Sequence, residues 1–536
     1  MRFLKEAALI LASLLSIALA QAAQAEEGTP GPSPEISSRT IRTVEITGNK
    51  AFKSSELMKH LTVQPGQPFD ENQFVFSHGS LESFYRDQGY FEVTVATETV
   101  KLPNKEIDCR FKIEEGEIYH VNSVRVTGLK LIQESVIKRE MKIEPGDPFS
   151  QNRIYEATKS LFLSGYFETI DISYSSATAH TMDIVAKIKE RPTKYIKGGF
   201  GYGAETKERL SLGYEDKNFF GHTRKLDLSG VVSGFTRQPD KYQTTILQGS
   251  LAQPHLFDSE YDGKTSLSQE WDKRESYYSA NAKWQTAVGR RFGKSITANL
   301  QYRYEGVHTT HLSPDEINDT PAFTNISAIG PNVTYDNTND PFLPFYGWRV
   351  TSLFEKGFNW VLGDLNFYKF TARVGRFETY FKETTFFSGL QFGVERPTDP
   401  AQPMPIFERF YLGGANSVRG YEERQLGPKD SEGAPTGGEA FGVVNLELRH
   451  RLYKKLFGVM FLDGGQLWER GDGQAWPDVN VQKLNDLAYG TGFGIRFHTP
   501  VGAIRLELGY QLNPPGEGSP AFFHRTAVHF SLGEVF

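Results

Sequence analysis

Apolar residues alternate with polar or small residues from about Thr193 onward, in runs of ten or more. The clearest run, AIRLELGYQL, begins at Ala503 and alternates throughout its length. Such alternation places the two kinds of side chain on opposite faces of a β-strand. Residues 193–536 hold about sixteen segments of this kind. This even number of long strands favours a 16-stranded antiparallel transmembrane β-barrel over a soluble sandwich, whose strands are shorter.

A different pattern fills residues 39–192, where short alternating strands and helical periodicity occur twice. VEITGNK matches VRVTGLK, PGQPFD matches PGDPFS, and GYFE occurs in both copies, each about 80 residues apart. Ordered matches at one spacing indicate a duplicated structural unit. Each copy predicts the order β-α-α-β-β, an α+β unit with a helix pair over a small sheet. We expect one such domain at residues 39–117 and the second at residues 118–192.

The N-terminal residues have the pattern of a secretory signal. Arg2 and Lys5 precede an apolar run, and the small residues Ala23 and Ala25 fit a cleavage site. We expect a signal peptide over residues 1–25, followed by a linker over residues 26–38. A permanent membrane anchor is the alternative, but the apolar run is short for a spanning helix.

Charge and cysteine content exclude other classes of protein. The net charge is −6 and no Lys/Arg run exceeds two residues, so no nucleic-acid partner is expected. The single cysteine, Cys109, cannot form an intramolecular disulfide and reads as an ordinary half-buried thiol. The small sheets leave edge strands that could pair with an extended segment of another chain.

The segment RFYLGGANSVRGYEERQLGP contains an arginine, Arg419, within a Gly- and Pro-rich loop. A lone loop arginine is usually solvated, so the surrounding pattern decides its meaning. Together with the two repeats, the barrel, the stretch YDNTNDPFLPFYGWRV and the final Phe536, this segment resembles the BamA/TamA superfamily of outer-membrane assembly proteins. The repeats look like POTRA domains, although BamA-type proteins usually carry five and TamA-type proteins three.

The resemblance implies a role for the loop motif Val418, Arg419, Gly420 and Tyr421. In that family the sixth extracellular loop folds into the barrel lumen, where its arginine contacts carboxylates of the inner wall. By this resemblance, Arg419 is expected to contact Glu447 and Asp463. Glu447 is also out of phase with Val444, Leu446 and Leu448, so it faces the lumen if those three face lipid. Asp463 has a less clean phase, but a lipid-facing carboxylate would be costly.

The first predicted barrel strand, YIKGGFGYGAE, is rich in glycine. Glycine weakens a strand because it packs no side chain and loses more backbone entropy on ordering. We therefore expect the seam between the first and last strands to open sideways. This lateral gate comprises Gly198, Gly199, Gly201, Gly203 and the terminal Phe536. The alternative is that these glycines only relieve crowding inside a tilted barrel.

Other candidate sites are weaker. His308 and His311 lie near Asp315 and Glu316, but two histidines beside acids are common at surfaces, so no metal is expected. The stretch DNTND, residues 336–340, lacks the glycine and closing glutamate of a calcium loop. GGFGYG is not followed by a predicted helix and is not a phosphate cradle. No nucleophile elbow is present, so we expect no enzyme activity and no cofactor.

Two functions remain open. The first is an assembly factor that receives unfolded barrel clients on its POTRA-like repeats and inserts them through the lateral gate. The alternative is a secretion pore of the two-partner type, which threads an extended exoprotein through the lumen and whose relatives also carry the loop motif. Either places the barrel in the outer membrane of a Gram-negative bacterium with the repeats in the periplasm. Expected partners are the client or passenger, outer-membrane lipids and accessory periplasmic proteins or lipoproteins.

Overall fold

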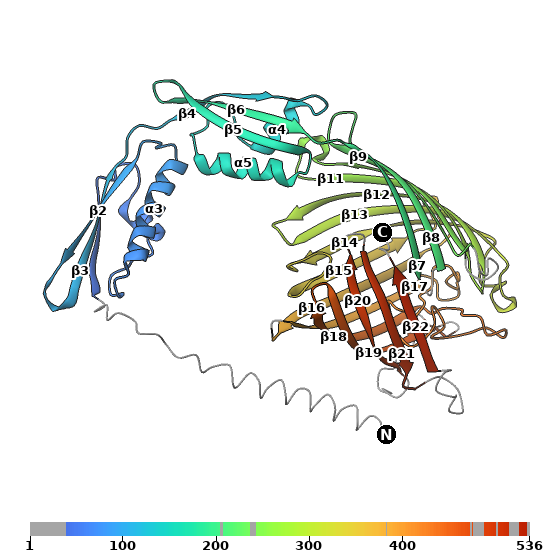
Figure 1. Cartoon of the computed structure of the whole chain (residues 1–536). Coiled ribbons are helices and arrows are strands. Elements are labelled where there is room, and N and C mark those ends of the chain that lie inside the picture. The colour runs from blue at the N-terminus through green and yellow to red at the C-terminus, as the bar shows by residue number, and fades with distance from the viewer. Residues whose placement is uncertain are drawn as a thin grey trace. The chain divides into compact units, whose positions relative to one another are not determined.

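The computed structural model divides the chain into two compact units, Met1–Pro192 and Thr193–Phe536 (Figure 1). The expected signal peptide, the linker and Phe536 lie outside the residues that the structure describes. In those described residues, no helix is long and apolar enough to cross a membrane. The described residues are 39–203, 207–235, 243–381, 383–471, 474, 477, 487–499, 502–513 and 525–532.

Each repeat has the predicted order β-α-α-β-β, and its sheet places the last strand in the centre. The sheet orders are β1-β3-β2 and β4-β6-β5, with the first strand of each repeat parallel to the central one. The predicted first helix of the first repeat is split into one α turn and one 3₁₀ turn. The first repeat contains β1 (Thr40–Thr47), α2 (Ser54–Leu57), η1 (Met58–His60), α3 (Glu71–Asp87), β2 (Thr94–Lys101), η2 (Pro103–Lys105) and β3 (Glu106–Glu114). The second contains β4 (His120–Thr127), α4 (Glu134–Met141), α5 (Gln151–Leu163), β5 (Phe167–Thr178) and β6 (Thr181–Glu190).

Local sequence explains where the long helices begin and which face they bury. The Asp70 side chain accepts the backbone N–H groups of Asn72 and Gln73 and caps α3, and Ser150 caps α5 by accepting the N–H of Arg153. The buried residues of both helices recur at helical spacing, so one face of each helix packs on its sheet. These residues are Phe74, Ser77, Leu81 and Tyr85 in α3 and Ile154, Ala157 and Leu161 in α5.

Steric crowding explains why a glycine follows the first strand of each repeat, in the Thr-Gly pair. Gly48 and Gly128 follow the first strands with φ of 82° and 88°. A Cβ atom at either position would lie 2.1 or 2.2 Å from the carbonyl oxygen of Ile113 or Ile188 in the central strand. Only glycine fits this close approach and this backbone conformation. The repeated glycine therefore fixes the same corner in both units.

Residues from Thr193 onward form a closed barrel of sixteen strands, as predicted, in which β22 returns to pair with β7. Neighbouring strands pair antiparallel throughout. The strands are β7 (Lys194–Gly203), β8 (Lys207–Phe219), β9 (Arg224–Ser233), β10 (Gln243–Gln253), β11 (Asp262–Lys273), β12 (Tyr278–Phe292), β13 (Ile296–Thr310), β14 (Phe323–Asp336), β15 (Gly347–Gly357), β16 (Phe367–Tyr380), β17 (Thr384–Pro397), β18 (Ala440–Tyr453), β19 (Leu456–Trp468), β20 (Ala488–Thr499), β21 (Gly502–Gln511) and β22 (Thr526–Leu532).

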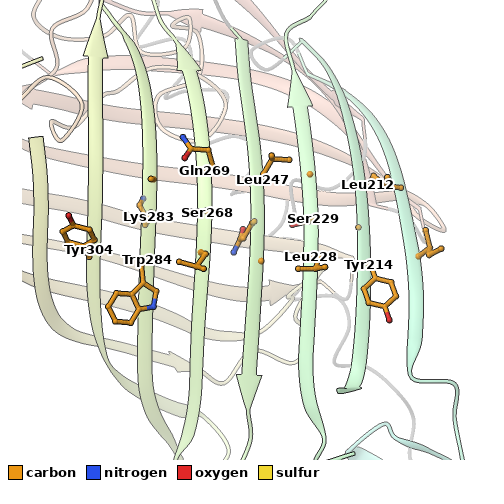
Figure 2. A pocket seen from close by; sticks show the side chains of 17 residues that line it. Leu212, Tyr214, Leu228, Ser229, Leu247, Ser268, Gln269, Lys283, Trp284 and Tyr304 are labelled. Atoms are coloured by element: carbon orange, nitrogen blue, oxygen red, sulfur yellow. The ribbon is translucent and has the colours of Figure 1, made fainter. Parts of the chain in front are cut away.

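The two faces of the barrel wall differ as the alternation predicts. On the outer face, leucines and aromatic residues are exposed, and Leu212 and Leu247 retain 66% and 51% of their accessible surface. Figure 2 shows this apolar wall, with Leu228 and Trp284 on neighbouring parts of the same surface. On the inner face, charged residues are buried. They contact residues 398–439, the connection between β17 and β18, which we call the inner loop.

Candidate functional site

The structure brings Arg419 of the inner loop together with both carboxylates that the sequence paired with it. Arg419 donates from Nε and Nη2 to the two carboxylate oxygens of Asp463, at 2.7 and 2.9 Å. Its Nη1 donates to Glu447 at 2.7 Å. The same nitrogen donates to Glu507 of β21 at 3.2 Å, a third carboxylate that the sequence analysis did not identify. The Asp463 geometry is the bidentate pairing for which a guanidinium is suited.

The cluster is buried and balanced in charge. Arg419 is 4% exposed, and the three carboxylates are 3% exposed or less. Arg449 and Arg496 also pair with Glu447, at 2.5 and 2.7 Å, so three arginines face three carboxylates. The Arg419 guanidinium lies 3.7 Å from the centre of the Phe461 ring, which closes one side of the cluster. Such an arrangement is stable only while every charge keeps a partner.

The neighbours of Arg419 hold the loop against the last strands of the barrel. Gly420 donates its backbone N–H to His529 Nε2 of β22 at 3.1 Å, and its carbonyl accepts from Gln511 of β21 at 2.9 Å. The Tyr421 hydroxyl donates to the carbonyl of Asn513 at 3.2 Å. Val418 is fully buried in an apolar cluster formed by the loop and the wall. The loop motif therefore touches the strand that closes the barrel.

Glycines of the inner wall allow the loop backbone to approach the wall closely. A Cβ atom on Gly490 of β20 would lie 1.7 Å from the Arg419 carbonyl oxygen. A Cβ atom on Gly509 of β21 would lie 2.4 Å from the Gly420 nitrogen. Any side chain at either position would push the loop away. This surface was not predicted from the sequence, although both glycines occupy lumen-facing positions of the alternating strands.

A second ion cluster, also not identified from the sequence, holds the inner loop at Glu408. Glu408 accepts from Arg303 of β13 at 2.7 Å and from Lys369 of β16 at 3.1 Å. Arg303 also pairs with Glu355 of β15, and Lys369 with Glu395 of β17. The inner loop thus places the carboxylate of Glu408 among cations of β13 and β16. It places the guanidinium of Arg419 among carboxylates of β18, β19 and β21. In the sequence, only the charged residues Glu408 and Arg409, in the stretch FERF, could have indicated this cluster.

The acidic residues considered for a metal instead bond to the inner loop. Glu316 pairs with Arg409 at 2.7 Å, and Asp315 accepts the backbone N–H of Ser431 at 2.8 Å. The His311 ring stacks on Tyr278 with ring centres 4.4 Å apart, while His308 lies in β13. In the described part of the chain, no three His, Cys, Asp or Glu side chains are grouped as metal ligands would be.

The DNTND segment also uses its carboxylates internally. Asp336 accepts from Arg349 at 2.8 Å. Asp340 accepts the backbone N–H groups of Phe342 and Leu343, both at 2.8 Å. These hydrogen bonds lower the pKa of Asp340, whose carboxylate lies in the connection between β14 and β15. The segment forms a rigid turn that carries Phe342 and Leu343.

The seam between β7 and β22 closes the barrel. Among the described residues, which end at Leu532 in β22, it pairs Gly203 with Ser531 and Tyr202 with Leu532. A Cβ atom on Gly201 would lie 2.9 Å from the Leu532 carbonyl oxygen. Gly199 faces Ser211 of β8 on the lumen side.

Strand β7 contributes a further glycine and an aromatic ring to the seam. Gly198 has no atom within 4 Å of an added Cβ atom. The rings of Tyr202 and Phe530 meet across the seam with centres 6.0 Å apart. The GGFGYG stretch lies within β7 and leads to strand β8. The site therefore combines a glycine-rich seam with a loop that contacts one of its two strands.

Two family models match the chain. One described as "Omp85 superfamily domain" matches residues 194–536. The POTRA model, described as "Surface antigen variable number repeat", matches residues 39–116 and 119–191.

Curated relatives of the chain carry the names of assembly proteins. The chain is 26% identical over 471 residues to the outer membrane protein assembly factor BamA of Nitratidesulfovibrio vulgaris, covering 85% of this chain and 56% of that one. It is 24% identical over 549 residues to BamA of Neisseria meningitidis serogroup B, covering 92% and 66%. The chain therefore spans between 56% and 66% of the length of these two relatives. The sorting and assembly machinery component 50 homolog of Bos taurus is 24% identical over 450 residues, covering 77% and 90%.

Solved structures share the fold. BamA from Haemophilus ducreyi lacking POTRA domains 1-3 aligns with a TM-score of 0.72 at 17% identity, covering 92% of this chain and 99% of that one. CdiB from Escherichia coli aligns with a TM-score of 0.54 at 14% identity, covering 97% and 96%.

Proposed function

Because the chain belongs to the Omp85 superfamily, we propose that it assembles outer-membrane proteins, by receiving unfolded barrel clients on its repeats and inserting them through the β7–β22 seam. The barrel lies in the outer membrane and the POTRA repeats lie in the periplasm, as in the BamA relatives. The resemblance drawn from the sequence is thereby confirmed. The partners in this proposal are unfolded β-barrel clients, membrane lipids and accessory periplasmic proteins or lipoproteins.

The observation that carries the proposal is the glycine-rich strand β7, which closes the barrel against β22. Glycine packs no side chain and loses more backbone entropy on ordering, so this strand should separate from its partner more easily than its neighbours do. Opening exposes unpaired backbone groups, and a client strand can satisfy them where lipid cannot. Gly199, Gly201 and Gly203 alternate with Phe200 and Tyr202 along β7, so the lumen face of this strand carries few side chains.

The repeats offer a second set of unpaired edges. The sheet orders leave β2 and β1 at the edges of the first sheet and β5 and β4 at the edges of the second. Most residues of β2 are exposed. An extended client segment could add to such an edge by main-chain hydrogen bonding, which requires no particular client sequence. This suits a receptor for many unfolded proteins.

The inner loop favours insertion over the alternative of secretion through the lumen. Its two ion clusters end on β13 and β16 at one end and on β18, β19 and β21 at the other. A loop held to the wall at Glu408 and at Arg419 occupies the path that a passenger chain would take. Release of both clusters would be needed before an extended chain could pass.

A disulfide across the seam tests the proposal. Gly203→Cys with Ser531→Cys joins two paired residues of β7 and β22. Gly213→Cys with Ser229→Cys joins β8 to β9 in the same way and serves as the matched control. In proteoliposomes, we expect the oxidised seam variant to lose client insertion by at least tenfold and to regain it on reduction, while the control inserts normally. Normal insertion through the oxidised seam would exclude the gate and favour passage through the lumen.

A further inference from the structure

A small cavity near one end of the barrel lumen is lined by cations and lacks acidic residues. Its volume is about 160 Å³. The connection between β14 and β15 contributes three apolar residues, and strands β15, β16, β18, β19, β20 and β21 contribute the rest. The lining residues are Phe342, Leu343, Pro344, Arg349, Phe377, Arg449, Phe457, Arg496, His498 and Arg505. Four guanidinium groups therefore line one small space, and no carboxylate lines it with them.

The carboxylates nearest to these arginines do not line the cavity. Glu447 and Glu507 bond to Arg496, with distances of 2.7 Å from Arg496 Nε to Glu507 and from Nη2 to Glu447. Asp336 bonds to Arg349. None of these three acids is among the lining residues. Carboxylates outside the cavity thus hold Arg349 and Arg496 in place, and the surface that the arginines present to the cavity is positive.

Many hydrogen-bond donors of the lining remain unused. In the described residues, Arg505 forms no side-chain hydrogen bond and no ion pair, although five N–H groups are available on a guanidinium. Arg449 uses only Nε, in its bond to Glu447. Its two terminal nitrogens have no acceptor in the same set of residues. Several charge-assisted donors in one small space form a ready site for an oxyanion.

The apolar half of the lining restricts the ligand further. Phe342, Phe377 and Phe457 line the cavity beside the arginines, together with Leu343 and Pro344. Sites for drug-sized ligands usually measure about 300–1,000 Å³, so this cavity suits a single small group. An inorganic anion would use only the cationic side. A carboxylate or phosphate attached to an apolar group would use both.

The cavity lies on the periplasmic side of the barrel. Strand β7 follows directly after the periplasmic repeats, so it begins at the periplasmic end, and the connections that follow alternate between the two ends. By this count, the β14–β15 connection that carries Phe342 is periplasmic. A ligand can reach the cavity from the compartment in which the repeats lie.

We propose that this cavity, which we call the arginine pocket, binds a small oxyanion carried on an apolar group. Binding places the anion among Arg449, Arg496 and Arg505, where it reduces the repulsion between like charges and accepts the unused donors. The apolar carrier packs against the phenylalanines. This inference does not depend on the proposed insertase activity, because binding itself is the quantity measured.

Calorimetric titration of the full chain in uncharged maltoside micelles tests the proposal. The probes are 3-phenylpropionate, inorganic phosphate and the neutral 3-phenylpropionamide. We expect saturable binding of 3-phenylpropionate, at least tenfold weaker binding of phosphate, and no binding of the amide. Equal binding of the amide would overturn the site, and equal binding of phosphate would overturn the role of the apolar half.

Two arginine variants locate the binding. Arg505→Gln removes the lining arginine that forms no side-chain hydrogen bond or ion pair with any described residue, so we expect the barrel to fold and the affinity for 3-phenylpropionate to fall at least tenfold. Arg373→Gln changes a lumen-side arginine of β16 that does not line the pocket and is the matched control. Unchanged affinity in Arg505→Gln, or an equal loss in Arg373→Gln, would overturn the assignment. Heat-modified mobility on gels verifies that each variant has folded.

Discussion

The repeats and the barrel have opposite kinds of interior. Each repeat is built around an apolar cluster in which Leu81, Tyr85 and Phe111, or Ile137 and Leu161, are fully buried. The barrel interior is built around ion clusters that hold the inner loop. Apolar packing is non-directional and spread over many contacts. Buried charges are directional, and the removal of one partner leaves another charge uncompensated. A few residues should therefore control the barrel interior, while no single polar residue should control a repeat.

The largest effect is expected for Arg419→Ala. Three carboxylates lose a partner, and breaking a buried charge pair in this way costs about 3–5 kcal/mol. We expect the inner loop to leave the wall and become cleavable by protease in an otherwise folded barrel. Arg419→Lys should restore part of the protection, because lysine keeps the charge but not the bidentate geometry. Arg373→Ala is the control, and wild-type protease resistance in Arg419→Ala would contradict the comparison.

A smaller effect is expected for Glu408→Gln. Arg303 retains Glu305 and Glu355, and Lys369 retains Glu395, so neither cation is left alone. Loss of the charge-assisted bonds to Glu408 should cost about 1.5–3 kcal/mol. The same protease assay should show intermediate cleavage of the inner loop. Cleavage faster than in Arg419→Ala would reverse the ranking of the two clusters.

Gly490→Ala should displace the loop motif without removing any charge. The added Cβ atom would lie 1.7 Å from the Arg419 carbonyl oxygen, so the loop or the strand must shift. Overpacking of this kind costs about 1–3 kcal/mol. Gly458→Ala is the control, since its Cβ atom would make only ordinary contacts with Leu452 at 3.4 Å or more. Melting temperatures of the two variants in micelles should differ, and equal values would show that the wall has room.

The smallest effect is expected in a repeat, for Asp108→Asn. Hydrogen bonds from Arg42 and Thr43 lower the pKa of Asp108. A carboxylate whose pKa is lowered by folding stabilises the folded state above its unfolded pKa of about 3.9, and this contribution is lost as pH falls through the folded value. At pH 7 the variant should open the first repeat more often than the wild type. The difference should shrink as the pH falls below about 3.9.

Cys109 reports this opening. Burial raises the pKa of its thiol to about 11, so the folded repeat should protect it from reagents. Its rate of reaction with 4,4′-dithiodipyridine, which reacts with thiols even in acid, measures how often the repeat opens. Asp183→Asn alters the equivalent residue of the second repeat, where Ser123 and Asn122 donate, and is the matched control. Faster labelling in both variants would mean that the repeats open as one unit.

Periodicity made the architecture predictable from the sequence. The repeat matches predicted two β-α-α-β-β units, and the alternation predicted sixteen strands, both confirmed. Phase along β18 also placed Glu447 on the lumen side. Along β19, the alternation of apolar and polar residues did not show clearly which way Asp463 points, because Phe461 lies on the same face. The structure explains this apolar ring on the lumen side, since the Arg419 guanidinium stacks on it.

The contacts of the inner loop were less predictable. Glu408 meets Arg303 across 105 residues of sequence, and no local pattern indicates which luminal charges will meet. The partners of Gly420 in β21 and β22 are likewise fixed by how the barrel closes. Glu507 and His529 occupy lumen-facing positions, so alternation could have indicated their direction. It could not have indicated their partners.

The inner loop also divides the barrel mechanically. Its bonds reach β13, β15, β16, β18, β19, β21 and β22, so this part of the cylinder is cross-braced through its centre. Strand β22 belongs to the braced part, while β7 is joined to β8 by the ladder of its own pairs. Elastic deformation concentrates where bracing is least. If the seam opens as proposed, β22 should stay with the braced part of the barrel, and β7 should be the strand that moves outward.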